Sequence, residues 1–375
     1  MSRCTACGSC GCKRATTAVI FRGGCAGSTR LRPAPGRALL DSWQPDVLHS
    51  HDWVAAEAGI ALAKAAPRPL VATIHATEAG LWNGWITNSL SQARHDAETW
   101  LVRSATRTIV CSEAMRAEVS AALKVPADEL TKVHNAVDIA AWRTTNDQQE
   151  RARAELGVPS DAPLVVLAGR IEWEKSGDVA VRALPSICRA RPGTHLVVAG
   201  TGSQRPTLEK LARARRVIRA VRFVGHLSES DLAALLGAAD VALLPSSYEP
   251  FGMVALEAGA AGTPVVAGAA GGLPEVVANG RTGLLVTHRD SEALAAAVVA
   301  VLRDPALAAG LVLAAQRDIE GPIRLAGRGS GDREGLCRGD RRRPSAASPT
   351  QASRTWQRVR RRTRRQLIRP TSRAH

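Results

Sequence analysis

Two glutamates flank a Pro-Phe-Gly turn in the stretch SSYEPFGMVALEAGAAGTPVVAG, residues 246–268. Glu249 is expected in a loop, and Glu257 one turn into a helix. Gly252 and Met253 begin that helix, where free N–H groups and the helix dipole favour an anion. A carboxylate beside an anion is unfavourable unless it binds something else. We therefore interpret the glutamates as hydroxyl acceptors, one for a sugar and one for a ribose; the alternative is a turn acid and a helix-end charge.

Two cations follow an earlier apolar run, in the loop AGRIEWEK at residues 168–175. Arg170 can bind a phosphate through two N–H groups, and Lys175 can act as a point charge. Together they suit a diphosphate, although a pair of surface charges is the alternative. Gly271 and Gly272, in a later loop, allow a close approach of the backbone.

These loops belong to a chain of alternating short apolar runs and helical patterns, which predicts βαβ units and parallel sheets covered on both faces. Residues 135–143 are expected to be an irregular linker between two series of strands. The expected strands are Val47–His49, Leu70–Ile74 and Thr108–Cys111 in the first series, and Leu164–Ala168, His195–Ala199, Val221–Val224, Val241–Leu244, Pro264–Ala267 and Leu284–Val286 in the second.

The second series is enough for one complete doubly wound domain, whereas the first is too short for one. In such folds ligands bind outside the carboxyl ends of the strands. Nearly every loop that follows an expected strand carries glycine, a charge or histidine. The site is therefore predicted at that edge.

The net charge of +16 is concentrated at the two ends of the chain. Residues 317–375 carry +12 and residues 1–40 carry +7, which leaves −3 for residues 41–316. That central part has no charge pattern for binding a nucleic-acid backbone. The Arg-rich tail, 317–375, is expected to be disordered or non-native; the alternative is an arm that binds nucleic acid or acidic lipid.

Five of the eight cysteines lie in the first 25 residues. Their spacing resembles part of a zinc or iron–sulfur site, but no second pair with finger spacing and no nearby histidine follows. No metal is therefore expected. The sequence shows no signal peptide pattern and no apolar run long enough for a membrane span, so a cytoplasmic location is expected.

The stretch EPFGMVALEAGAAGTPVVAGAAGGLPEVV, with GRIEWEK upstream, resembles the nucleotide-sugar half of retaining GT-B glycosyltransferases, in particular the glycogen-synthase-like family four. HSHDW followed by TIHATEAG resembles the acceptor half of bacterial α-glucosyltransferases. The resemblance covers residues 41–316. It implies two Rossmann-like α/β domains facing across a cleft, the first of them incomplete.

The resemblance also implies roles for single residues. Arg170 and Lys175 would hold the donor diphosphate, Glu249 would contact the transferred sugar, and His75 would reach that sugar from the first domain. His51 and Asp52 would shape the acceptor side. The positions implied to bind the donor are Gly200, Gly202, Val224, Gly225, Phe251, Gly252, Met253, Glu257, Gly271 and Gly272.

The implied function is retaining transfer of a hexose, glucose first, from UDP- or ADP-glucose to a glycan, as in the biosynthesis of glycogen or a related polysaccharide. No cofactor is implied, and the oligomeric state stays open.

The implied domains are an atypical segment at 1–40, a partial acceptor-side domain at 41–145, a nucleotide-sugar domain at 151–316, and the tail. No equivalent of the family's first strand and Gly-rich loop is evident before residue 41. The chain thus resembles a member truncated at its N-terminus, and the alternative is an inactive fragment that binds nucleotide sugars.

Overall fold

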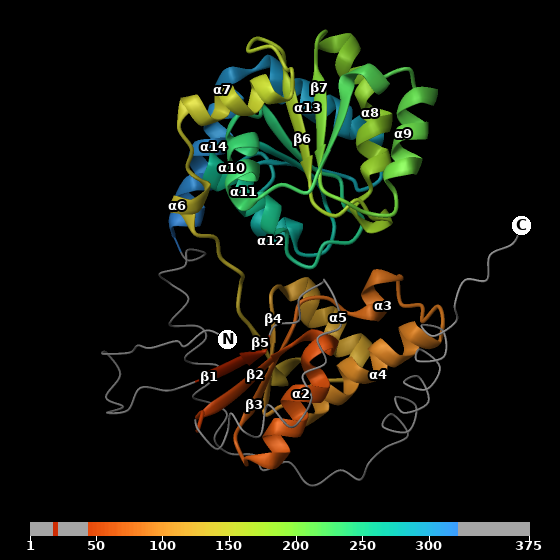
Figure 1. Ribbon diagram of the computed structural model, residues 1–375, viewed down its shortest axis with the longest axis vertical. Helices are drawn as coiled ribbons and strands as arrows, with labels where there is room; N and C mark the ends of the chain where they lie inside the picture. Colours follow the sequence, from red (N-terminus) through yellow and green to blue (C-terminus); the bar gives the residue numbers. More distant parts are fainter. Residues whose placement is uncertain (1–17, 22–43, 322–375) are drawn as a thin grey trace, which may run out of the picture. The chain divides into compact units, whose positions relative to one another are not determined.

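The computed structural model describes residues 18–21 and 44–321, and it divides the chain into two compact units (Figure 1). Among the described residues, unit 1 comprises 18–21, 44–110 and 116–132, and unit 2 comprises 111–115 and 133–321. Each unit is built around one parallel sheet. The cysteines of the first 25 residues and nearly all of the Arg-rich tail lie outside the described residues.

The sheet of unit 1 has its strands in chain order, β1-β2-β3-β4-β5, with every neighbouring pair parallel. The helices α2 and α4 that connect its strands pack against each other (Figure 1). The strands are β1 Ala18–Phe21, β2 Val47–His51, β3 Leu70–Ile74, β4 Arg107–Val110 and β5 Leu130–Lys132, and the helices are α2 Asp52–Ala65, α3 Glu78–Leu81, α4 Ser89–Ser104 and α5 Glu113–Leu123.

Two of these strands correct the expectations from sequence. We expected no strand before residue 41, but β1 pairs with β2 and places Ala18 opposite Val47. The sheet of unit 1 therefore begins within the segment 1–40. β5 was missed because only one of its three residues, Leu130, is apolar, so no apolar run marks it.

The sheet of unit 2 has the order β11-β10-β9-β6-β7-β8, and all its pairs are parallel. The chain runs outward from β6 to β8, returns beside β6 as β9, and then runs outward on the other side. This reversal makes the sheet doubly wound, as predicted. Its strands are β6 Leu164–Ala168, β7 His195–Ala199, β8 Val221–Gly225, β9 Val241–Leu244, β10 Val265–Gly268 and β11 Leu284–Val286.

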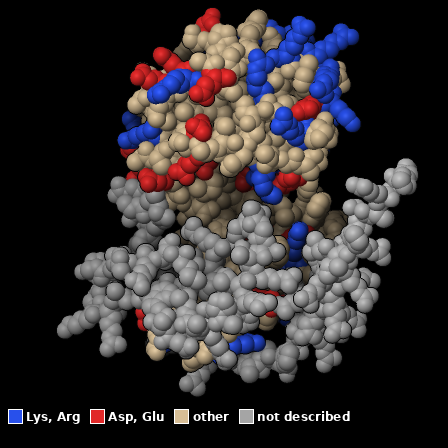
Figure 2. Space-filling model, viewed as in Figure 1, with Lys and Arg blue, Asp and Glu red and all other residues tan. Residues whose placement is uncertain are grey.

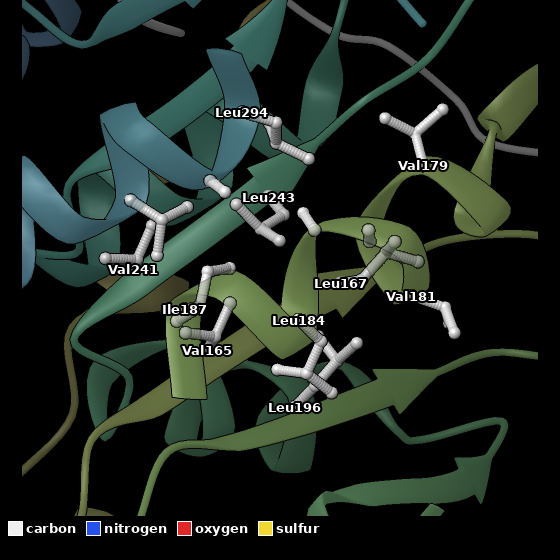
Figure 3. Close-up of a cluster of buried hydrophobic side chains, with 14 of the residues drawn as sticks. Val165, Leu167, Val179, Val181, Leu184, Ile187, Leu196, Val241, Leu243 and Leu294 are labelled. Carbon is white, nitrogen blue, oxygen red and sulfur yellow. The ribbon is translucent and has the colours of Figure 1, made fainter. Parts of the chain in front are cut away.

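Helices cover both faces of the sheet of unit 2, with α8 and α9 on one side and α10 and α11 on the other (Figure 1). On one face, alternate residues of the central strands, such as Val165 and Leu167, pack against α8 and α13 (Figure 3). The intervening residue Val166 is also fully buried, so both faces lie in the core. The helices are α6 Ile139–Trp142, α7 Asn146–Glu155, α8 Gly177–Ala190, α9 Arg205–Ala214, α10 Glu229–Gly237, α11 Met253–Ala261, α12 Leu273–Val276, α13 Ser291–Arg303 and α14 Pro305–Glu320.

Three of these helices were not predicted. The short helix α6 lies in the expected linker. The helix α7 buries no side chain, so it has no apolar stripe, and the Thr145 capping box marks its start instead. The helix α14 crosses the expected boundary at residue 316, and Arg281 forms an ion pair of 2.6 Å with its Asp318. Residues 317–320 therefore belong to unit 2 and not to the tail.

The charge of unit 2 is unevenly distributed over its surface. Figure 2 shows lysine and arginine gathered on the side that carries α8 and α9. Arg213, Arg215 and Arg216 are exposed there. Residues 41–316 are thus near neutral as a whole, but part of the surface of unit 2 is basic.

No single helix among the described residues is long and apolar enough to cross a membrane. Only α13 and α14 taken together meet the criteria of length and composition, and a bend of 99° separates them.

Candidate functional site

The candidate site of unit 2 lies where the order of strands reverses. Lys175 follows β6 and Glu249 follows β9, and these two strands are neighbours in the sheet. Lys175 Nζ lies 2.6 Å from Glu249 Oε2. The Ser246 hydroxyl donates to the same oxygen at 3.2 Å. The predicted cation and the predicted sugar-binding acid thus meet at the position where doubly wound sheets bind ligands.

The main chain of Glu174 joins the two loops. Its carbonyl oxygen accepts hydrogen bonds from Ser247 N at 2.9 Å and from Tyr248 N at 3.3 Å. Its buried carboxylate accepts from Arg170 Nη2 at 2.7 Å. The Arg170 side chain is 64% exposed, so its guanidinium is held at one end and open to solvent elsewhere. Such a group can bind an incoming anion without leaving a buried charge unpaired.

The anion site was predicted at the N-terminus of the helix α11. Its N-cap is Gly252, with φ of 106°, and its first turn, which begins at Met253, carries no acidic side chain. The N–H groups of this turn therefore face no carboxylate of their own helix. Phe251 is buried and packs into unit 2, which leaves its main chain as the part that could contact a ligand.

Gly271 and Gly272 bring their loop close to the loop of Glu249. Gly272 N donates to Glu249 O at 2.8 Å. A Cβ at Gly271 would overlap that same carbonyl oxygen, and one at Gly272 would overlap the oxygen of Pro250. The close backbone approach predicted from these glycines is thus an approach of one loop to another.

Glu257 is half-buried on α11, and burial raises its pKa to about 7, with a further contribution from the charge of Glu229. A solvated charge at a helix end would keep its ordinary pKa. Burial therefore distinguishes Glu257 from a fully solvated charge at a helix end. Near neutral pH this group can either accept or donate a hydrogen bond.

Glycines also shape the loops after β7 and β8. Gly200, with φ of 143°, donates its N–H to Gly225 O at 2.7 Å, and a Cβ on it would overlap the carbonyl oxygen of Gly169. A Cβ on Gly202 would overlap the main chain of Ile171. These glycines hold the loops after β6, β7 and β8 together. Val224, at the end of β8, is half-buried beside them.

Sequence reasoning missed two polar contacts in these loops. Glu172 accepts hydrogen bonds from Ser203 N at 2.9 Å and from Ser203 Oγ at 2.6 Å. These bonds lower the pKa of Glu172. Ser246 binds Glu249 as described above. Both serines lie in loops that follow predicted strands, and this position in the sequence could have indicated that they belong to the site.

Unit 1 brings together the three polar residues predicted for it. His51 Nδ1 lies 2.8 Å from His75 Nε2, and the two rings stack with centroids 5.1 Å apart. Asp52 accepts the His75 N–H at 2.7 Å. The pKa of Asp52 is raised mainly by burial, which the electrostatic interaction with His75 and the main-chain hydrogen bonds from His75 and Ala76 partly offset. Because β2 and β3 are parallel neighbours, the histidines at their ends become a pair.

A buried acid that we did not predict holds the loop after His75. Both carboxylate oxygens of Glu98, on α4, lie within 3.2 Å of Glu78 N, at the start of α3. Burial raises the pKa of Glu98 to about 8, and the nearby acids Glu78, Asp52 and Glu118 add to the effect. Glu98 is therefore protonated at neutral pH.

Known protein families match residues of both units. Residues 148–318 match the family "Glycosyl transferases group 1", and residues 19–141 match "Glycosyltransferase Family 4". An uncharacterised glycosyltransferase of Methanocaldococcus jannaschii is 33% identical over 276 residues, which are 73% of this chain and 70% of that protein. The chain belongs to the glycosyltransferases. The expectation of a GT-B fold with two Rossmann-like domains is confirmed.

This glycosyltransferase is also similar to two further proteins. A glycogen synthase of Mycobacterium tuberculosis is 48% identical over 267 residues, which are 71% of this chain. The chain spans 62% of the length of that relative. The solved sucrose-phosphate synthase of Thermosynechococcus elongatus shares the fold with a TM-score of 0.70 at 27% identity, over 82% of this chain and 76% of that one.

Proposed function

We propose that the protein transfers glucose from a nucleoside-diphosphate sugar to a glycan acceptor, with retention of the anomeric configuration, as in the synthesis of glycogen or a related α-glucan. The Lys175–Glu249 pair at the reversal of the sheet of unit 2 is the observation that carries this proposal. The similarity to a protein named glycogen synthase supports the choice of glucose and of a glucan. We expect the reaction to take place in the cytoplasm.

In the proposed reaction the donor diphosphate binds at the N-terminus of α11, with Arg170 and Lys175 around it. Negative charge grows on the diphosphate as the bond to the sugar breaks, so both cations stabilise the transition state more than the bound donor. Glu249 already orients Lys175. Its second oxygen is proposed to accept a hydroxyl of the sugar.

The remaining residues are assigned to the other parts of the donor and to the transferred sugar. Glu257 is assigned to the ribose, and the loops of Gly200 and Gly225 to the nucleoside. His75 is assigned to the transferred sugar, with His51 and Asp52 fixing the position of its ring and main chain. The acceptor hydroxyl then enters on the face that the diphosphate leaves. Its oxygen bonds to the anomeric carbon as the bond to the diphosphate breaks, and its proton passes to the departing diphosphate. Catalysis is mostly positioning and charge stabilisation.

Glucosyl transfer from UDP-glucose and from ADP-glucose to glycogen tests this function directly. Transfer with either donor, with retained configuration in the product, supports the proposal. Donor binding in calorimetry without transfer would instead select the alternative of an inactive nucleotide-sugar-binding protein. Absence of both binding and transfer would contradict both assignments.

Glu257 should make nucleotide affinity depend on pH near neutrality. The ionised carboxylate accepts hydroxyls at both oxygens, whereas the protonated form has lost part of that capacity. Because the pKa lies at about 7, we expect UDP or ADP to bind several-fold more tightly at pH 8 than at pH 6. Glu257→Gln should remove this dependence. An equal slope of affinity against pH in the wild type and the variant would rule out the ribose contact.

A further inference from the structure

Exposed apolar side chains gather in one short segment of unit 1. Among the described residues, five large hydrophobic side chains are exposed, and three of them lie within residues 82–90: Trp82 at 38%, Trp85 at 75% and Leu90 at 50%. Single exposed apolar residues are ordinary, but three within nine residues of the chain make the segment a candidate binding surface. We call this segment the 82–90 surface.

A tight turn holds the two tryptophans close together. Trp85 N donates to Trp82 O at 3.0 Å, and the residues between them, Asn83 and Gly84, have φ of 51° and 89°. An Asn-Gly pair with positive φ at both positions is typical of a type I′ turn, whose end Cα atoms lie within about 7 Å. The two indoles therefore start from neighbouring points of the backbone.

The turn is anchored to the buried part of unit 1. Trp82 Nε1 donates to Glu78 Oε1 at 3.2 Å, and Glu78 also pairs with Arg94 at 3.3 Å. Gly84 N donates to Ala79 O at 2.7 Å. One indole is thus tethered while the other is exposed on a fixed turn. A surface that is rigid before binding loses little entropy when a ligand arrives.

The segment itself is polar between its apolar residues and carries no charged side chain. Residues 79–93 contain no Asp, Glu, Lys or Arg, in a chain in which 22% of residues are charged. Exposed amide and hydroxyl side chains stand between the apolar ones, at Asn83, Thr87 and Asn88. Such a surface offers nothing to a phosphate backbone or an acidic peptide. It matches a ligand that is neutral and rich in hydroxyl groups.

We propose that the 82–90 surface binds the glycan acceptor, with a sugar ring stacked on the Trp85 indole and neighbouring hydroxyls bonded to Asn83 and to the second amide N–H of Asn88. The oxygen of Asn88 caps α4, and its first amide N–H donates to Thr87. The C–H face of a sugar ring is apolar and suits an aromatic face, while its rim carries hydroxyls. Rigid Trp with adaptable Asn, Ser and Thr is an effective combination for such recognition. The surface begins seven residues after His75, in the segment that continues the loop after β3. This inference rests on the proposed function and deepens it.

Calorimetry of the full chain with maltoheptaose tests the proposal, with donor binding measured in the same preparations. We expect Trp85→Ala to weaken maltoheptaose binding at least about tenfold, and Trp85→Phe to retain most of it. Leu313→Ala is the matched control, because Leu313 is a similarly exposed apolar residue of unit 2, at 55%. Leu313→Ala should change neither the affinity for maltoheptaose nor the affinity for the donor. Thermal unfolding confirms that each variant is folded.

Several results would overturn the inference. The first is that the wild-type chain does not bind maltoheptaose. The second is that Trp85→Ala and the wild type bind maltoheptaose with equal affinity. The third is that Trp85→Ala changes the oligomeric mass while its affinity for maltoheptaose is unchanged. The last would show that the surface joins copies of the chain. Trp85-dependent glycan binding in a protein that neither binds nor uses a nucleotide sugar would contradict the proposed function and leave this inference standing.

Discussion

Lys175→Ala is expected to reduce glucosyl transfer at least about a hundredfold, and Arg170→Ala is expected to do the same, because each removes one charge that stabilises the leaving diphosphate. The loss should fall mainly on kcat, since the charge of the leaving group grows toward the transition state. Lys175→Ala has a second effect, because Glu249 then stands unpaired beside the bound diphosphate. The affinity for UDP or ADP should fall as well, and calorimetry measures that part separately from turnover.

Lys210→Ala is the matched control for this experiment. Lys210 is an exposed lysine on α9 of the same unit, so its loss changes the net charge equally without touching the loops after β6 and β9. Removing Glu249 together with Lys175 should restore part of the nucleotide affinity that Lys175→Ala loses, because the uncompensated carboxylate is gone. Unchanged turnover in both Lys175→Ala and Arg170→Ala would show that the diphosphate binds elsewhere.

Glu98→Gln is expected to change how the stability of the protein depends on pH. The pKa of Glu98 is raised by folding, from an ordinary 4.5 to about 8, so the folded state binds its proton more tightly. The stabilisation from this group is therefore full below pH 4.5 and is lost as the pH rises through about 8. The whole difference is on the order of 5 kcal/mol. Glutamine cannot ionise, so the variant should gain stability relative to wild type by roughly that amount between pH 5 and pH 9.

Urea unfolding at several pH values measures this difference. The exposed Glu150 of α7 provides the control, because Glu150→Gln removes an acid of the same type that is already solvated. It should leave the shape of the pH dependence unchanged. Parallel curves for Glu98→Gln and wild type across pH 5 to 9 would mean that Glu98 is solvated in the native state. The loop that carries His75 would then need another anchor.

The strands of unit 2 were predictable from sequence because most of them are short apolar runs between loops of glycine and polar residues; β8, which contains Arg222, is the exception. Four of them, Leu164–Ala168, His195–Ala199, Val241–Leu244 and Leu284–Val286, have the predicted ends. Parallel strands buried on both faces need continuous apolar residues, which stand out from their flanks. The elements that escaped prediction lack such a contrast. β5 has a single apolar residue, Leu130, and α7 buries none of its side chains.

The residue types of the site also came from sequence, but their partners did not. Lys175 and Glu249 are 74 positions apart, and nothing in either loop indicates that they pair. Their contact depends on β9 returning to the side of β6, which is a property of the order of the strands. His51 and His75 likewise meet because β2 and β3 are neighbours in register, with His51 opposite Thr73.

By itself, then, the sequence determined which segments become buried parallel strands, which loops carry cations, acids and glycines, and which family the chain resembles. Those properties are local, since they depend on side-chain polarity and backbone freedom within a few residues. Only the tertiary structure decided that Glu98 is buried and protonated, that Glu257 has a pKa of about 7, and that Trp85 stands exposed on a turn. Burial and pairing depend on what distant segments place around a residue, and the order of strands in a sheet decides that.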